Sequence, residues 1–117
     1  GYDDDVRTFN NVLKAAARSG NQHQAKVWFN RIQAAGLTPD AASFNLMINA
    51  AAKCGDVEGA TKWFRRMADA QLKQDIVCYS SLMDAFAKRG DLSAAKDVYV
   101  QAINAGLAPS RITFKTL

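Results

Sequence analysis

The chain has 117 residues and a formal net charge of +4, from 15 basic and 11 acidic side chains. No apolar run approaches the length needed to cross a bilayer, which excludes a membrane-spanning helix. The two cysteines, Cys54 and Cys78, have no metal-ligand spacing, so neither a disulfide framework nor a zinc site is expected and a reducing compartment is the default. The mild positive charge suits an anionic partner without requiring one.

A period of 35 residues runs through the sequence. One glycine column and several alanine columns keep this step through three copies, and aromatic residues occupy two further columns. The glycine column is Gly20, Gly55 and Gly90. The aromatic columns are Phe9, Phe44, Tyr79 and Phe114, and Phe29, Phe64 and Tyr99. Self-similarity at this period predicts a stack of small units, each too small to bury its own apolar face.

The period divides the chain into three complete units and two short ends. We expect a lead-in and cap at 1–5, repeat units at 6–40, 41–75 and 76–110, and the start of a fourth unit at 111–117. Because the chain opens with Gly1 instead of Met and the fourth unit stops early, the sequence indicates a fragment of a longer array. Any targeting segment would then lie upstream.

Each unit begins with the pattern of an amphipathic helix. Within residues 6–18 the apolar side chains fall at positions i, i+3, i+4 and i+7, which predicts a helix with one apolar face. These positions are Phe9, Val12, Leu13 and Ala16, and they recur as Phe44, Met47, Ile48 and Ala51 and as Tyr79, Leu82, Met83 and Phe86. The residues that precede each such stretch are Asp5, Asp40, Asp75 and Ser110. Their side-chain oxygens can accept hydrogen bonds from the free backbone N–H groups of a first helical turn.

The glycine column predicts where this first helix ends, because a left-handed residue costs little only when it is glycine. A second helix is expected directly after it, with N-caps at Asn21, Asp56 and Asp91. In the first unit its apolar stripe comprises Ala25, Trp28, Phe29 and Ile32. No segment shows the alternation of a β-strand. The sequence therefore predicts an all-α fold, an α-solenoid of stacked helix–turn–helix hairpins.

The motifs at the unit boundaries resemble pentatricopeptide repeats. VRTFNNVLKAAARSG, ASFNLMINAAAKCG and VCYSSLMDAFAKRG open the three units, and GLTPD and GLAPS close two of them. The resemblance covers the chain from Val6 onward. The tetratricopeptide repeat is also a helical hairpin, but its period is 34 residues. The second unit departs from the pattern, because Gln71 and Gln74 stand where the family has glycine and proline.

This resemblance implies binding of single-stranded RNA with one base addressed by each repeat. In the family, the fifth and the last residue of a unit face the base edge. The corresponding pairs here are Asn10 with Asp40, Asn45 with Asp75, and Ser80 with Ser110. The family's pattern links Asn with Asp to uridine and a serine at the first place to purines, so the expected preference is 5′-U-U-purine-3′. The serine pair lies outside the well-defined combinations.

The chemical properties of these residues support part of this interpretation without the family resemblance. An Asn amide offers donors and an acceptor that match the Watson–Crick edge of an unpaired base, although Asn10 and Asn45 are also compatible with a solvated helix surface. Asp40 and Asp75 are explained by N-capping alone. The two interpretations are compatible, because a capping side chain also sits between adjacent units.

A basic column lies in the last turn of each first helix and comprises Arg18, Lys53 and Lys88. These cations complement the helix dipole, and stacking of helices about 8–10 Å apart would also align them in a row that follows an RNA backbone. In the family, a further column sandwiches each base between successive units. Its members here are Arg7, Ala42, Val77 and Ile112. Ala42 is short for this role, whereas the guanidinium plane of Arg7 can stack on a base.

No catalytic or metal-binding constellation emerges from the sequence, so we expect neither an enzyme nor a cofactor in this stretch. His23 has no partner at a useful spacing, and the acidic run at 3–5 is better explained as a helix cap. The competing hypothesis is a protein-interaction solenoid within a larger complex, with other subunits or further repeats as partners. A catalytic domain outside this stretch is a third. The family resemblance implies a role in RNA processing, stability or translation in mitochondria or chloroplasts.

Overall fold

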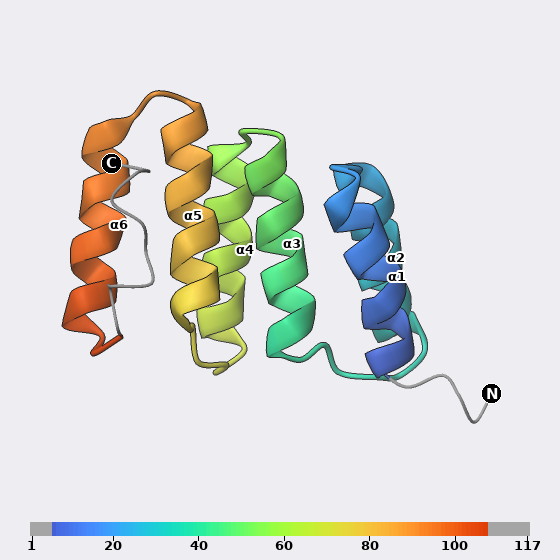
Figure 1. Cartoon of the computed structure of the whole chain (residues 1–117). Helices are drawn as coiled ribbons and strands as arrows, with labels where there is room; N and C mark the ends of the chain where they lie inside the picture. Colours follow the sequence, from blue (N-terminus) through green and yellow to red (C-terminus); the bar gives the residue numbers. More distant parts are fainter. Residues whose placement is uncertain (1–5, 108–117) are drawn as a thin grey trace.

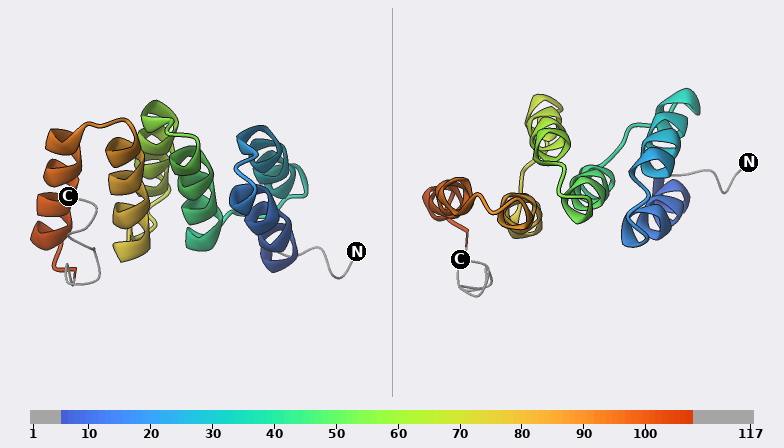
Figure 2. Two further views of the ribbon diagram at one scale, coloured as in Figure 1. Left: turned by 45° about the horizontal axis from the view of Figure 1, so that its top comes forward. Right: turned by 90° about the horizontal axis from the view of Figure 1, so that it is seen from above.

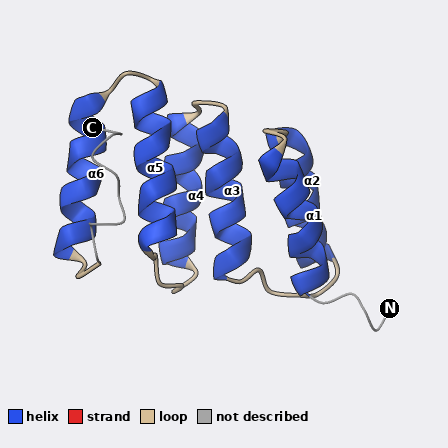
Figure 3. Cartoon of the chain, viewed as in Figure 1, coloured by secondary structure: helices blue, strands red, loops and turns tan. Residues whose placement is uncertain are grey.

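The computed structural model describes residues 6–107, which form six α-helices of 13 residues each (Figure 1). The helices are α1 (Val6–Arg18), α2 (Gln22–Ala34), α3 (Ala41–Lys53), α4 (Val57–Asp69), α5 (Ile76–Lys88) and α6 (Leu92–Asn104). Within this range there is no strand (Figure 3). The prediction of an all-α solenoid of helical hairpins is confirmed.

The predicted N-caps form where their side chains reach the first turn. The Asp40 carboxylate accepts a hydrogen bond from the backbone N–H of Ser43 at 3.0 Å, and Asp75 accepts one from the backbone N–H of Cys78 at 3.1 Å. The second helices are capped in the same way by Asn21, Asp56 and Asp91. The caps predicted at Asp5 and Ser110 lie outside the described residues. Local sequence chemistry therefore accounts for five helix starts.

The junction between the second and third units keeps the shape of the other junctions despite its unusual sequence. Gln71 adopts a left-handed backbone with φ of +62°, close to the +80° of Gly36 at the equivalent place. The side-chain amide of Gln74 donates a hydrogen bond of 2.7 Å to the backbone carbonyl of Phe64 and so ties the connection to α4. Gln71 in place of the family's glycine adds local backbone strain, because glycine adopts this left-handed conformation without steric conflict and a residue with a side chain does not.

Gln71→Gly should raise the free energy of unfolding by about 1 kcal/mol, because it removes the steric cost of a left-handed residue with a side chain. Part of the gain is offset, because glycine increases the conformational entropy of the unfolded chain. Ala70→Gly is the matched control, because the neighbouring Ala70 has φ of −81° and gains nothing from glycine. Chemical denaturation measures both. An unchanged or lower stability for Gln71→Gly would contradict the strain argument.

The helices pack in two layers that place equivalent residues in rows. Seen from above, α1, α3 and α5 follow one another, with α2 and α4 behind them (Figure 2). Each first helix packs against the next first helix and against its own second helix, whereas the second helices pack chiefly against first helices. We call α1, α3 and α5 the first-helix layer. Because successive repeats differ by a nearly constant step, a side chain at one repeat position recurs along this layer.

The units pack together through small side chains, which let the helices approach closely, and through aromatic side chains, which contact the next unit. The predicted alanine column of the second helices is fully buried at Ala25, Ala60 and Ala95, which allows close approach of the helices. Phe29 carries the contact between the first two units. Its ring centre lies 4.6 Å from that of Trp63 and 5.1 Å from that of Phe44, both in edge-on geometry. The core is therefore continuous from one unit to the next.

Candidate nucleic-acid interface

The first-helix layer carries a row of small polar side chains. They occupy the fifth residue of α1, α3 and α5, and we call Asn10, Asn45 and Ser80 the polar row. Asn10 and Asn45 are half-buried, and Ser80 is exposed. Asn45 and Ser80 lie at positions fixed by the N-caps of α3 and α5, which are Asp40 and Asp75. A polar side chain at this depth remains accessible to a ligand.

The first predicted pair is brought together by a hydrogen-bond network between units. The amide nitrogen of Asn10 donates to the carboxylate of Asp40 at 3.0 Å, and its oxygen accepts from the hydroxyl of Ser43 at 2.6 Å. Ser43 is fully buried, and its oxygen also accepts from the backbone N–H of Asp40 at 3.2 Å. The Asn10 amide keeps one N–H and one oxygen lone pair for a further partner.

The second predicted pair has a different arrangement. The oxygen of Asn45 accepts a hydrogen bond from the thiol of Cys78, and Asp75 is engaged by its own helix cap. Within residues 6–107 no hydrogen bond joins Asn45 to Asp75. Ser110, the second member of the third pair, lies outside the described residues. Of the two predicted pairs that lie within the described residues, the first is directly hydrogen-bonded and the second is not.

Ser43 and Cys78 were missed by the sequence analysis. Both occupy the third residue of a first helix and are fully buried, whereas Thr8 at the same place in α1 is exposed. The signal available in the sequence was the small polar character of this column, which comprises Thr8, Ser43, Cys78 and Thr113. A buried hydroxyl or thiol requires a hydrogen-bond partner, and here the partner is the asparagine of the preceding unit.

The protonation states at these sites follow from burial and hydrogen bonding. Partial burial of Asp40 favours its neutral form, but hydrogen bonds from Asn10 and Ser43 outweigh this effect and hold the pKa of Asp40 below its usual value. Burial raises the pKa of the Cys78 thiol to about 12. At neutral pH Asp40 is therefore a carboxylate that only accepts hydrogen bonds, and Cys78 is a neutral thiol that donates one.

Asp56 is a second carboxylate held in its charged form. A hydrogen bond of 2.7 Å from the Gln22 side chain, together with the backbone N–H of Gly59, lowers the pKa of Asp56 below its usual value. Gln22 lies in α2 and Asp56 caps α4, so the bond joins the second helices of two successive units. This carboxylate supports the stacking of the units.

Acid should therefore destabilise the fold through Asp40 and Asp56. Because their folded pKa values lie below the usual 3.8, their contribution to stability is fully present above pH 3.8 and is lost as the pH falls through the folded values. Thermal unfolding between pH 6 and pH 2 should show a falling Tm below pH 4. Asp56→Asn should flatten this fall. Asp97→Asn on the exposed face of α6 is the control, and an equal effect of both variants would contradict the assignment.

A row of cations runs along one end of the first-helix layer. Arg18, Lys53 and Lys88, which we call the basic row, are the last residues of α1, α3 and α5 and are all exposed. They lie at the upper ends of these helices in Figure 1. The ammonium group of Lys88 donates to the backbone carbonyl of Lys53 at 3.4 Å, which complements a helix C-terminus of the preceding unit. In the described part of the chain none of the three forms an ion pair with a carboxylate.

The predicted base-stacking residues lie in the first turns of the same helices. Arg7, Ala42 and Val77 are exposed, and half of the Val77 side chain is accessible, at 52%. Val77 and Ser80 line a hollow of about 360 Å³ together with Ile76 and Ser81. Ile112 lies outside the described residues. The polar row and an exposed apolar side chain therefore meet directly on α5.

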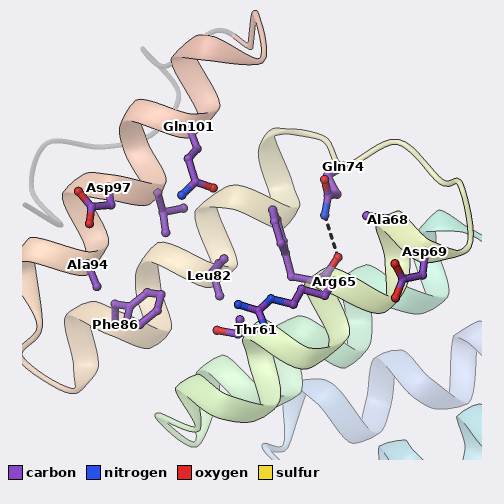
Figure 4. A pocket seen from close by; sticks show the side chains of 12 residues that line it. Thr61, Arg65, Ala68, Asp69, Gln74, Leu82, Phe86, Ala94, Asp97 and Gln101 are labelled. Carbon is purple, nitrogen blue, oxygen red and sulfur yellow. Dashed lines mark hydrogen bonds between the residues drawn. The ribbon is translucent and has the colours of Figure 1, made fainter.

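A second hollow, of about 610 Å³, lies between α4, α5 and α6 (Figure 4). Its apolar lining includes Phe64, Leu82, Phe86 and Val98. Val98 stands at the repeat position of Trp63, whose indole packs against Phe29 in the preceding unit. The smaller valine leaves this hollow. Sequence analysis did not identify it, because a change of side-chain size within an apolar column does not disturb the helical pattern.

Residues 6–107 contain no group of three or more His, Cys, Asp or Glu side chains arranged to hold a metal ion. His23 is exposed on α2. No helix in the described range is both long and apolar enough to span a bilayer. Cys54 is an exposed C-cap residue of α3, and Cys78 is buried in α5. The side chains described on the first-helix layer thus provide hydrogen-bonding groups, surfaces for stacking and positive charge.

The fold and the repeated positions define a helical-hairpin repeat protein. Models of the PPR repeat family match residues 4–53 and 39–88, and a further model of the PPR repeat matches 77–107. The chain belongs to the pentatricopeptide repeat family. No curated protein matches it significantly.

Solved structures support the same assignment. The chain is similar to the pentatricopeptide repeat protein PPR10 in complex with an 18-nt psaJ RNA element, with 31% identity and a TM-score of 0.88 over 100% of this chain and 17% of that one. PPR10 from maize gives 24% identity and a TM-score of 0.77 over 96% of this chain and 16% of that one. The PPR domain of Arabidopsis thaliana protein-only RNase P 1, in complex with tRNA, shares the fold at 13% identity and a TM-score of 0.73, over 96% of this chain and 56% of that one. The chain thus spans about a sixth of the PPR10 chains that it matches.

Proposed function

We propose that the chain binds single-stranded RNA along the first-helix layer, with one base addressed by each repeat. Membership of the pentatricopeptide repeat family and the similarity to an RNA-bound PPR10 structure support this proposal. The observation that carries it is the hydrogen-bond network of Asn10, Asp40 and Ser43. This network holds a half-buried amide at a repeat boundary with one donor and one acceptor unused, in a layer that ends in cations with no carboxylate partner among residues 6–107.

The hydrogen-bonding capacity of the Asn–Asp pairs favours uridine over cytidine. Uracil presents the N3–H donor between two carbonyl acceptors, whereas N3 of cytosine is an acceptor. The Asp40 carboxylate only accepts, because its pKa is lowered and it stays charged. An acceptor-rich site therefore attracts the uracil N3–H and repels the cytosine N3. With Asn45 and Asp75 in the second repeat and Ser80 in the third, the proposed preference is 5′-U-U-purine-3′.

The remaining residues supply affinity without sequence preference. The basic row would contact the phosphate backbone, because phosphate contacts position a nucleic acid and do not read its sequence. Arg7, Ala42, Val77 and Ile112 would stack against the bases, with Val77 the best exposed apolar member among the described ones. Because Ala42 is short, stacking should be stronger at the third base than at the first two.

The cellular role follows from the family resemblance. We propose a part in RNA processing, stability or translation, in mitochondria or chloroplasts. No catalytic step is proposed for this chain, whose contribution would be to hold a defined stretch of unpaired RNA.

Binding of labelled oligouridine and oligoadenosine RNA, followed by fluorescence anisotropy at several salt concentrations, tests the proposal. Three phosphate contacts predict a slope of about −2 for log affinity against log salt concentration. The chain should prefer oligouridine. Failure to bind either RNA, or affinity that does not change with salt, would contradict RNA binding and favour a protein-interaction solenoid.

The third repeat offers a test of the side-chain code. Ser80→Asn combined with Ser110→Asp should move the third base preference from purine to uridine, because the repeat then carries the same pair as the first two. Competition between 5′-UUA and 5′-UUU RNA measures the change. The single Ser80→Asn variant is the control, which lacks the carboxylate. An unchanged preference in a folded double variant would disprove the code for this repeat.

A further inference from the structure

The two Asn–Asp pairs are identical in sequence but not in their surroundings. Asn10 and Asn45 occupy the same place in α1 and α3, and each accepts a hydrogen bond from the third residue of the next first helix. That third residue is Ser43 in one case and Cys78 in the other. Both are fully buried, so neither exchanges its partner for water.

Ser43 fixes the orientation of the Asn10 amide. Its hydroxyl donates to the Asn10 oxygen at 2.6 Å, while the Asn10 nitrogen donates to Asp40 at 3.0 Å. Turning the amide by 180° would place its oxygen against the Asp40 carboxylate, which loses the bond to Asp40 and sets two acceptors against each other. The hydroxyl is itself held, because its oxygen accepts from the backbone N–H of Asp40. The amide therefore presents one defined edge.

Cys78 holds the Asn45 amide less firmly. Each side chain has a second acceptor within reach of its single hydrogen, the Asp40 carboxylate at 3.0 Å for Ser43 and the Met67 sulfur at 3.4 Å for Cys78. A thiol is nevertheless a weaker donor than a hydroxyl. In the described structure the Asn45 nitrogen makes no bond to Asp75, so turning the amide loses only one weak bond. The neutral state of the thiol keeps it a donor at physiological pH. Asn45 is therefore free to present either edge.

We propose that the third residue of each repeat sets the base selectivity of the preceding repeat by orienting its asparagine, so that the first repeat discriminates uridine from cytidine more sharply than the second. This inference rests on the proposed RNA binding. Uracil and cytosine differ in the direction of hydrogen bonding at N3 and at the adjacent exocyclic group. An amide of fixed orientation distinguishes them, whereas an amide that turns accommodates both.

Two reciprocal variants test this inference. Cys78→Ser should increase selectivity for 5′-UUA over 5′-UCA, and Ser43→Cys should decrease selectivity for 5′-UUA over 5′-CUA. Each change should be about fivefold, the factor that one ordinary hydrogen bond contributes. Dissociation constants from NMR titration of the chain at low salt give the ratios. Ser43→Ala and Cys78→Thr serve as second variants if either exchange disturbs folding.

Cys54→Ser is the matched control, because it replaces sulfur by oxygen at an exposed position outside the polar row. A second readout does not involve RNA. The side-chain NH₂ protons of Asn10 should exchange with water more slowly than those of Asn45, and Ser43→Cys should remove this difference.

The outcomes separate this inference from the proposed function. Binding of 5′-UUA with unchanged selectivity in both folded reciprocal variants would overturn the inference and leave RNA binding intact. Absence of binding to every RNA by the unmodified chain would overturn both. Opposite shifts in the two variants, each confined to its own base position, would support the inference.

Discussion

Replacing Phe29 with alanine should lower the free energy of unfolding by about 3–5 kcal/mol. The Phe29 side chain is fully buried, and its ring packs edge-on against Trp63 and Phe44 from the next unit. The Arg66 guanidinium lies 4.3 Å from the centre of the Trp63 ring and 5.7 Å from that of Phe29, so it contacts both rings of this cluster. Truncation would leave a cavity between units that these rigid rings cannot fill. The loss approaches the whole stability of a small domain, which is about 5–15 kcal/mol.

Urea unfolding followed by circular dichroism measures this effect. Val100→Ala is the control, because Val100 is 51% exposed on α6 and should change stability little. Native-state hydrogen exchange adds a spatial test, since a repeat array can lose one unit while its neighbours stay folded. We expect α1 and α2 to lose protection first. A loss of stability below about 1 kcal/mol would show that Phe29 does not carry the interface between units.

Replacing all three residues of the basic row with alanine should weaken RNA binding equally for every sequence. The slope of log affinity against log salt concentration should become flatter by about 2, because three backbone contacts are removed. The cations are exposed and make no ion pair in the described residues, so their removal should leave the fold intact. Lys88 also bonds the Lys53 carbonyl, and a small loss of stability is expected from that contact alone.

A charge-matched variant separates position from net charge. Lys26, Lys62 and Lys96 are exposed and lie on the second helices. Their replacement with alanine removes the same charge away from the first-helix layer and should affect binding much less. Equal loss in the two triple variants would mean that net charge alone attracts RNA. Loss confined to uridine-led RNA in the basic-row variant would contradict a pure backbone role.

The helices were predictable because their signals are local. An apolar stripe, a capping side chain and a terminal glycine all act within one unit, and Asp40 and Asp75 fulfil the predicted caps within hydrogen-bond distance. Repetition then placed equivalent residues in rows, so the alignment of Arg18, Lys53 and Lys88 also followed from the period.

Contacts between units were less accessible from sequence. The bond between Ser43 and Asn10 joins residues 33 positions apart, and its geometry depends on how α1 and α3 approach each other. Ser43 in one unit corresponds to Cys78 in the next, and this exchange leaves the helical pattern unchanged. It alters the hydrogen bond that the asparagine of the polar row accepts. The hollow beside Val98 arises in the same way, from one side chain whose size matters only once three helices are packed.

NMR titration with 5′-UUA, 5′-UUG and 5′-AAA RNA at low salt tests the central claim most directly. The account predicts chemical-shift changes concentrated at Asn10, Asn45 and the basic row, and stronger binding of the two uridine-led RNAs. Shifts confined to α2, α4 and α6, or no shifts with these RNAs and with a longer uridine-rich RNA, would contradict base reading by the first-helix layer.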